Sequence, residues 1–308
     1  MEKYLSKEHK QPIMQRKLIK QGDGALTVTL PKKWTKEKNL EAHDIVDIDE
    51  TEDGIVISAV GKKKEKTITV DVSEYNTRMI MNIIYQSYRL GFDTISLSFA
   101  HEEQYEAIQE VTKTLIGFEV VEKNKNKCTL QNIAEPDETK FEVMLRKIFL
   151  QIIQLSEDIV NNFDKNILKQ INETKLQVDK LTNYARRAVI RSNKSSLLYE
   201  IIAKLSVISH GYVYLYQYSV NKKLKKLGII IEHISEANKL MRTYYDAFYK
   251  KDFKLLYEIG VTKTKLFQKN DELLEKGKDA VVLSYIREII RNVQLNATVT
   301  IGYLLPSY

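Results

Sequence analysis

The chain has 308 residues, with 48 Lys and Arg against 41 Asp and Glu, which gives a net charge of +7 at pH 7. This length predicts two or three domains with sizeable cores, and the positive balance suits an anionic partner. The single cysteine, Cys128, excludes an internal disulfide and a metal site built from several cysteines.

Residues 1–12, MEKYLSKEHKQP, are polar and lack the apolar stretch of a secretory signal. We expect them to form a flexible arm. Together with the lone cysteine, this composition favours a cytoplasmic protein, because disulfides accumulate in oxidising compartments.

Residues 13–61 carry the signals of a small β-rich domain. The segment ALTVTL (25–30) alternates apolar and threonine side chains, which predicts a half-buried strand that ends at Pro31. Two apolar runs within IVDIDETEDGIVI (45–57) are separated by Asp53-Gly54, a frequent hairpin dipeptide. A segment this short cannot bury a core of its own, so we expect it to fold with a partner.

Charge is distributed unevenly along this domain. From Glu41 to Gly61 there is no Lys or Arg, and acidic residues accumulate instead. A small β-rich unit that needs a partner and is basic at one end is typical of a dimeric nucleic-acid-binding protein. The basic residues of its first part are Arg16, Lys17, Lys20, Lys32, Lys33, Lys36 and Lys38.

The segments LPKKW and IVDIDETEDGIVI resemble those of the AbrB/MazE/SpoVT swapped-hairpin domains. Where such domains usually carry a Gly-Asp pair before the second hairpin, this chain has His43-Asp44. The resemblance implies an interlocked homodimer that neutralises DNA phosphates with basic residues near the first strand and the following loop. Some domains of this type serve only for dimerisation, so an exposed basic face without DNA is the alternative. The matching DNA-binding positions are Arg16, Lys17, Lys20, Lys32 and Lys33.

Residues 66–134 show a mixed pattern in the order βαβαββ. Strands are predicted at 67–72 and 94–99, each followed by a helix, and a hairpin is predicted over 118–130. This order predicts a small sheet with helices on one face. The segment contains no phosphate-binding loop and no catalytic constellation, so we interpret it as a spacer or as a ligand-sensing module.

Residues 137–308 predict a bundle of six long helices. No proline lies between Pro136 and Pro306, and apolar residues recur at helical spacing. Short connections favour an up-and-down bundle, and Asp137 can cap its first helix. The most apolar stretch, 201–220, contains a lysine, a histidine and four tyrosines, so we expect no integral membrane segment.

Two acidic residues stand out in the bundle. Glu232 and Glu236 are four positions apart and therefore share a helix face, where like charges cost roughly 0.2–0.5 kcal/mol unless a cation compensates them. A metal ion could compensate them, and so could Lys239 and solvent. Asp179, near an apolar stripe of an earlier helix, could supply a third oxygen ligand. The charge pattern therefore leaves a metal site and a plain solvent-exposed face open.

The segments LQVDKLTNYARR and IIEHISEANKL resemble the metal-binding motifs of PhoU-type phosphate-uptake regulators. The resemblance implies an iron or zinc site with Asp179, Glu232 and Glu236 as ligands, and Arg187 matches an arginine of the family.

This chain also departs from that pattern. Lys175 occupies a position where the family often has an acid. The second copy of the motif begins at FQKNDELLEK, but its expected carboxylates are replaced by Asn292 and Asn296. The second half of the bundle is therefore expected to be poor in metal.

The order of an AbrB-like unit, a small α/β unit and a PhoU-like bundle is similar to that of archaeal PhoU-domain proteins, and RLGFDTIS and LIGFEVVEKNKN resemble their middle segment. The resemblance implies a phosphate-responsive transcription regulator and not an enzyme. Its bundle would sense state through metal, or through a phosphate transporter or sensor kinase.

Two other functions remain open from the sequence. The first is an adaptor that does not bind DNA and regulates a phosphate transporter or sensor kinase through protein contacts. The second is a metal-dependent hydrolase that uses Asp179, Glu232 and Glu236. No two of the five histidines stand at metal-ligand spacing and no nucleophile–base arrangement is evident, which disfavours a hydrolase.

Overall fold

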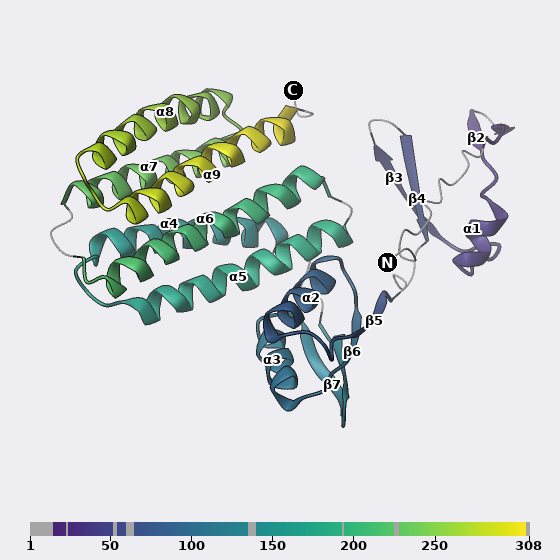
Figure 1. Cartoon of the computed structure of the whole chain (residues 1–308). Helices are drawn as coiled ribbons and strands as arrows, with labels where there is room; N and C mark the ends of the chain where they lie inside the picture. Colours follow the sequence, from purple (N-terminus) through teal and green to yellow (C-terminus); the bar gives the residue numbers. More distant parts are fainter. Residues whose placement is uncertain are drawn as a thin grey trace, which may run out of the picture. The chain divides into compact units, whose positions relative to one another are not determined.

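The computed structural model describes residues 15–22, 24–51, 54–59, 65–134, 140–192, 194–224 and 228–305. The chain divides into two compact units, Met1–Lys64 and Glu65–Tyr308 (Figure 1). The arm predicted over 1–12 and the capping residue Asp137 lie outside the described residues.

The first unit consists of two hairpins and a short helix. β1 (Ile19–Gln21) pairs antiparallel with β2 (Ala25–Thr27), and β3 (Val46–Thr51) pairs antiparallel with β4 (Gly54–Ala59). Between the hairpins, α1 (Lys32–Glu37) begins directly after Pro31. The β-rich domain is thus confirmed. The strand predicted over 25–30 ends at Thr27, because the residues after it have no strand to pair with in the described part of a single chain.

The first unit has no core of its own. None of its described side chains is buried. Seven large aliphatic side chains are exposed by 41–73%, namely Leu18, Ile19, Leu26, Val28, Ile45, Ile48 and Ile55. Aliphatic surface on this scale is rarely left to solvent in a monomer. This exposed surface supports the expectation that the unit folds with a partner, which stays a prediction.

The second unit begins with an α/β module in the predicted order. Its sheet has the strand order β5-β6-β8-β7, with β5 parallel to β6 and the other pairs antiparallel. Both helices pack on one face of the sheet, where Ile80, Ile84, Ile95, Ile108 and Leu130 are fully buried. The elements are β5 (Thr67–Asp71), α2 (Thr77–Arg89), β6 (Thr94–Ser98), α3 (Glu102–Thr112), β7 (Phe118–Asn124) and β8 (Lys127–Asn132).

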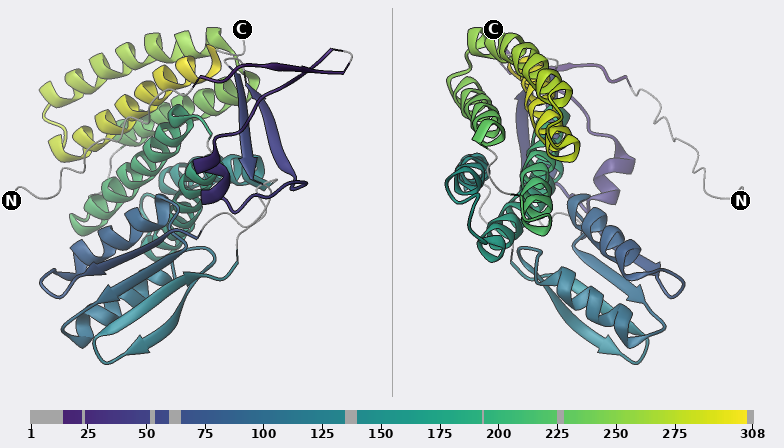
Figure 2. Two further views of the ribbon diagram at one scale, coloured as in Figure 1. Left: turned by 90° about the vertical axis from the view of Figure 1, so that its right-hand side faces the viewer. Right: turned by 60° about the vertical axis from the view of Figure 1, so that its left-hand side comes forward.

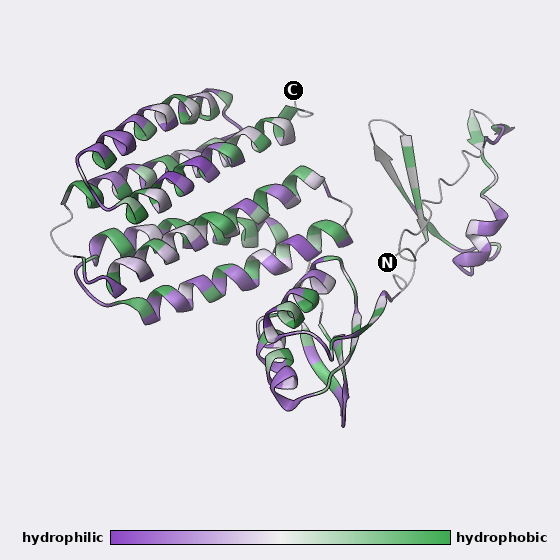
Figure 3. Cartoon of the chain, viewed as in Figure 1, coloured by the Kyte–Doolittle hydropathy of each residue, from purple (hydrophilic) through white to green (hydrophobic). Residues whose placement is uncertain are grey.

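The remainder of the second unit is the predicted helical bundle. It contains α4 (Phe141–Asn161), α5 (Leu168–Arg191), α6 (Ser196–Asn221), α7 (Gly228–Lys250), α8 (Phe253–Glu275) and α9 (Ala280–Leu304). The first three and the last three form two halves, which meet where α6 packs along α9 (Figures 1 and 2). Hydrophilic residues run along much of α5 and α8 at the outside of the bundle (Figure 3). No described helix is long and apolar enough to cross a bilayer.

A buried ion-pair cluster joins the α/β module to the bundle. Arg187 of α5 is 2% exposed, and its guanidinium donates to Asp93 Oδ1 at 2.9 Å and to the carbonyl oxygens of Tyr88 and Phe92. Arg191, one turn further along α5, donates to both oxygens of the same carboxylate at 2.8 Å. These contacts fix the start of β6 against α5.

Candidate nucleic-acid interface

All five basic residues predicted to bind DNA are exposed in the first unit. Arg16 and Lys17 precede β1, and Lys20 lies in its middle. Lys32 and Lys33 open α1. Pro31, with φ of −62° and an extended ψ of 124°, ends the preceding segment and directs the chain into that helix.

These cations are largely uncompensated. Lys33 has an ion pair of 4.0 Å with Glu37, but both side chains are more than half exposed, so the pair contributes little. Within the described part of the chain, Arg16, Lys17, Lys20 and Lys32 form no ion pair. Lys and Arg side chains in this state can neutralise phosphates and release the counterions of a nucleic acid.

The acidic part of the unit begins in the loop before β3. Asp44 Oδ2 accepts a hydrogen bond of 2.7 Å from the Glu41 amide, which closes this loop. His43 stands in it with φ of 76°, a left-handed conformation that favours glycine. A glycine, which the resemblance implies for this position, would adopt this conformation without strain. Among the described residues of the first unit, the basic side chains thus lie between Arg16 and Lys38.

The structure places Asp179 in an ion-paired cluster on α5. Lys175 Nζ lies 2.6 Å from Asp179 Oδ2, and His210 Nε2 of α6 lies 2.8 Å from Oδ1. Burial alone would raise the pKa of Asp179, but the hydrogen bond and charge of His210, together with those of Lys175, lower it below its usual 3.8. Lys175, noted as a departure from the family pattern, therefore supplies the positive charge that a metal would provide.

Glu232 and Glu236 share a lysine from the next helix. Lys269 Nζ of α8 lies 3.2 Å from Glu232 Oε1 and 2.8 Å from Glu236 Oε2. The described cation beside this pair is thus Lys269, which was not among the compensators considered from the sequence, namely a metal ion, Lys239 and solvent. His233, between them in sequence, is fully buried and approaches Glu236 Oε2 at 3.4 Å and Asn270 Oδ1 at 3.3 Å.

The predicted metal ligands lie on two different helices of the bundle. Asp179 lies on α5, which packs against α4 and α6, whereas α7 with Glu232 and Glu236 packs against α4, α8 and α9. Among the residues that the structure describes, no group of three or more His, Cys, Asp or Glu side chains is arranged to hold a metal ion. A metal at Glu232 and Glu236 would have to displace Lys269 from them, and this site stays a prediction.

The two asparagines in the second half have structural contacts. Asn296 is fully buried and donates from Nδ2 to the Ile201 carbonyl at 3.1 Å, linking α9 to α6. Asn292 donates to the Glu288 carbonyl at 2.9 Å within its own helix. Neither side chain carries a charge, and the expectation that this half is poor in metal stays a prediction.

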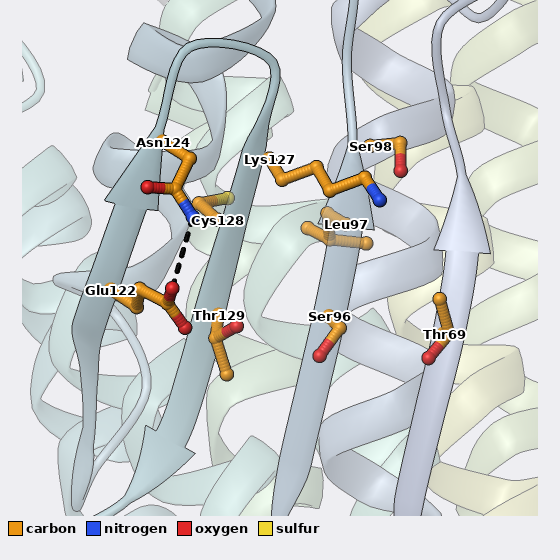
Figure 4. A pocket seen from close by; sticks show the side chains of 9 residues that line it. All are labelled: Thr69, Ser96, Leu97, Ser98, Glu122, Asn124, Lys127, Cys128 and Thr129. Carbon is orange, nitrogen blue, oxygen red and sulfur yellow. Dashed lines mark hydrogen bonds between the residues drawn. The ribbon is translucent and has the colours of Figure 1, made fainter.

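A polar cavity of about 260 Å³ lies on the open face of the α/β sheet (Figure 4). Thr69, Ser96 and Thr129 stand opposite one another across three neighbouring strands. At the β7 edge, Asn124 donates to Glu122 Oε1 at 2.9 Å, and Lys127 lies beside Ser98. This face offers hydroxyl groups to a ligand, and its arrangement contains no nucleophile–base pair.

Comparison with known protein families finds a match for the first unit. The family model described as "Antidote-toxin recognition MazE, bacterial antitoxin" matches residues 19–66. The first unit is a MazE-like domain. The match spans both hairpins and α1, and confirms that part of the resemblance seen in the sequence. Domains of this type are binding modules that typically dimerise and bind DNA, which fits a DNA-binding regulator or an antitoxin.

The comparisons do not extend to the rest of the chain. The matched region ends before β5, so it contains none of the α/β module or the bundle. No curated protein and no solved structure matches the chain. The PhoU-like character of the bundle therefore stays a prediction from the segments on α5 and α7.

Proposed function

We propose that this protein is a homodimeric DNA-binding regulator, in which the MazE-like units of two chains form one DNA-binding domain. The observation that carries the proposal is a unit with no buried side chain among its described residues, seven exposed aliphatic side chains and five exposed cations, four of which form no described ion pair. A monomeric spacer would need neither the aliphatic surface nor the cations.

The dimer is supported by the apolar surface of the unit. Full burial of one aliphatic side chain contributes about 1.5–3 kcal/mol, so covering all seven contributes on the order of 10 kcal/mol per chain before entropic costs. A second copy of the unit can cover them, because the same residues are exposed on both chains and a two-fold interface is self-complementary. The unpaired residues after β2 would then gain a strand partner.

DNA binding follows from what the dimer presents. Two copies of Arg16, Lys17, Lys20, Lys32 and Lys33 would act on one duplex. If about half of these ten cations contact phosphates, the logarithm of the binding constant should fall with the logarithm of salt concentration with a slope of roughly −4 to −5. Two-fold symmetry also implies a palindromic binding site.

In this proposal, the helical bundle senses the regulatory signal. The resemblance of the segments on α5 and α7 to PhoU-type regulators supports a response to phosphate supply in the cytoplasm. Metal at Glu232 and Glu236, or a phosphate transporter or sensor kinase, would carry the signal. The buried contacts of Arg187 and Arg191 support transmission, because they tie the bundle to the α/β module that follows the DNA-binding unit.

Fluorescence anisotropy of the full-length protein on duplex DNA tests the proposal. The Arg16→Ala/Lys33→Ala variant should bind more weakly on every sequence and show a flatter salt dependence. Lys147→Ala/Lys169→Ala, which removes two exposed lysines of the bundle, is the matched control and should bind like the parent protein.

Absence of binding at low salt would refute the DNA-binding role. The protein would then be a dimeric adaptor that acts through protein contacts, and the search would move to a phosphate transporter or sensor kinase. Equal losses in both double variants would mean that the charge of the whole protein, and not the MazE-like unit, holds the DNA.

A further inference from the structure

A cavity of about 570 Å³ lies between α8 and α9, separate from every residue considered so far as a ligand of DNA or metal. Pockets for small ligands typically have volumes of about 300–1,000 Å³. The lining includes Lys263 and Phe267 from α8, and Ser284, Arg287, Arg291 and Leu295 from α9.

Two cations in this cavity are held by one aromatic ring. Lys263 Nζ lies 4.2 Å from the centroid of the Phe267 ring, and Arg287 Cζ lies 4.1 Å from it. Attraction to the electron-rich face of the ring favours these positions. Arg287 also pairs with Asp271, which neutralises part of its charge. The ring therefore brings positive charge from both helices together at one place.

A third cation completes the positive lining. Arg291 follows Arg287 by one helical turn and shares its helix face. The Arg291 side chain is exposed and forms no ion pair or hydrogen bond with any described side chain. Among the described contacts, the Lys263 ammonium has only the one with the Phe267 ring. Like charges at this spacing repel one another, and the one carboxylate in the lining, Glu288, does not balance them. The cavity is thus short of negative charge.

We propose that the α8–α9 cavity binds a small molecule that carries an oligophosphate group. Arginine presents forked donors that match phosphoryl oxygens, and three cations from two helices suit a multiply charged anion better than a single carboxylate. Phe267 and Leu295 provide an apolar surface for the remainder of the ligand. This site is independent of the proposed DNA binding.

Isothermal titration of the full-length protein with sodium tripolyphosphate and with ATP, at constant ionic strength, tests the site. The Arg16→Ala/Lys33→Ala background weakens polyanion binding by the first unit, and effects of the cavity variants are compared within this background, so failure of this proposal stays distinct from failure of the DNA-binding proposal. In that background, Lys263→Gln/Arg291→Gln should weaken binding of both probes by at least about tenfold, because each residue contributes a charge-assisted contact. Lys265→Gln/Lys278→Gln removes two exposed lysines outside the cavity and should leave binding within about twofold.

Glu288→Gln provides a second test, in which binding is expected to become tighter and not weaker. This change removes the carboxylate from the lining and leaves all three cations, so both probes should bind severalfold more tightly. Circular dichroism would show whether each variant is folded. If Lys263→Gln/Arg291→Gln is not folded, the affinity of Glu288→Gln for the two probes tests the proposal. Binding that is absent in the background, or that responds equally to both double variants, would overturn the proposal, as would weaker binding by Glu288→Gln.

Discussion

Replacing Asp93 by alanine should destabilise the second unit strongly. Asp93 is 7% exposed and is the one acidic partner that the described contacts give to both Arg187 and Arg191. Without it, the Arg187 guanidinium stays buried and loses its described carboxylate partner, while its described hydrogen bonds to the carbonyl oxygens of Tyr88 and Phe92 remain. Removing one partner of a buried ion pair costs about 3–5 kcal/mol, because the other charge is left uncompensated.

The expected change in melting temperature follows from the size of the unit. For 150–250 residues, 1 kcal/mol corresponds to roughly 2–4 °C, so Asp93→Ala should melt about 6–20 °C lower by differential scanning calorimetry. Asp246→Ala is the matched control. Asp246 pairs with Lys250 at 3.5 Å, but both side chains are well exposed, and such pairs contribute roughly 0.5 kcal/mol or less. Equal melting temperatures for the two variants would refute the reasoning.

The same carboxylate predicts a dependence on pH. Burial would raise the pKa of Asp93, but the Lys66 amide and the guanidinium groups of Arg191 and Arg187 outweigh it and hold the pKa below its usual 3.8. A carboxylate with a lowered pKa stabilises the folded state above its unfolded pKa, and this contribution is lost as pH falls through the folded value. The difference in unfolding free energy between the parent and Asp93→Asn should therefore shrink below about pH 4.

Three further experiments test separate features. In urea denaturation, Gly211→Ala should destabilise the bundle by about 1–3 kcal/mol, because a Cβ there would lie 2.9 Å from Ile289 Cγ1. Gly260→Ala should stabilise the bundle by about 0.5–1 kcal/mol, because a Cβ at this helical position would meet open space. His43→Gly should stabilise the first unit by about 1 kcal/mol, since it relieves a positive φ, and an unchanged or lower melting temperature at fixed protein concentration would contradict this. Lys269→Met should increase zinc retained after gel filtration, measured by mass spectrometry, because it frees Glu232 and Glu236, whereas Asp179→Asn should leave retention unchanged.

Much of the fold follows from patterns that are local in the sequence. The βαβαββ order and the six helices are set by apolar periodicity, which identifies elements reliably when they are long. The first unit is different. The strand predicted over 25–30 ends at Thr27, because the residues after it have no strand to pair with in the described part of the chain. In the proposed dimer, the apolar alternation there would belong to the interface and not to an internal core.

The electrostatic sites were harder to predict, since charged contacts join residues that are distant in sequence. Glu232 and Glu236 were visible as a pair, but Lys269, which compensates them, lies on the next helix and has no sequence signal of its own. Arg187 matches an arginine of the PhoU-type pattern in the sequence, whereas its described contacts are with Asp93 and the α/β module. Only the packing of α5 against α2 brings them together.

The central claim, that two MazE-like units combine to bind DNA, is tested most directly by sedimentation velocity of the full-length protein with and without a palindromic duplex. The parent protein should sediment as a dimer and bind as two chains per duplex. Ile48→Glu places a charge on the exposed aliphatic surface and should lose the dimer and DNA binding together, whereas Val143→Glu, at an equally exposed position of the bundle, should change neither. A monomeric Ile48→Glu protein that binds DNA as tightly as the parent would contradict the account.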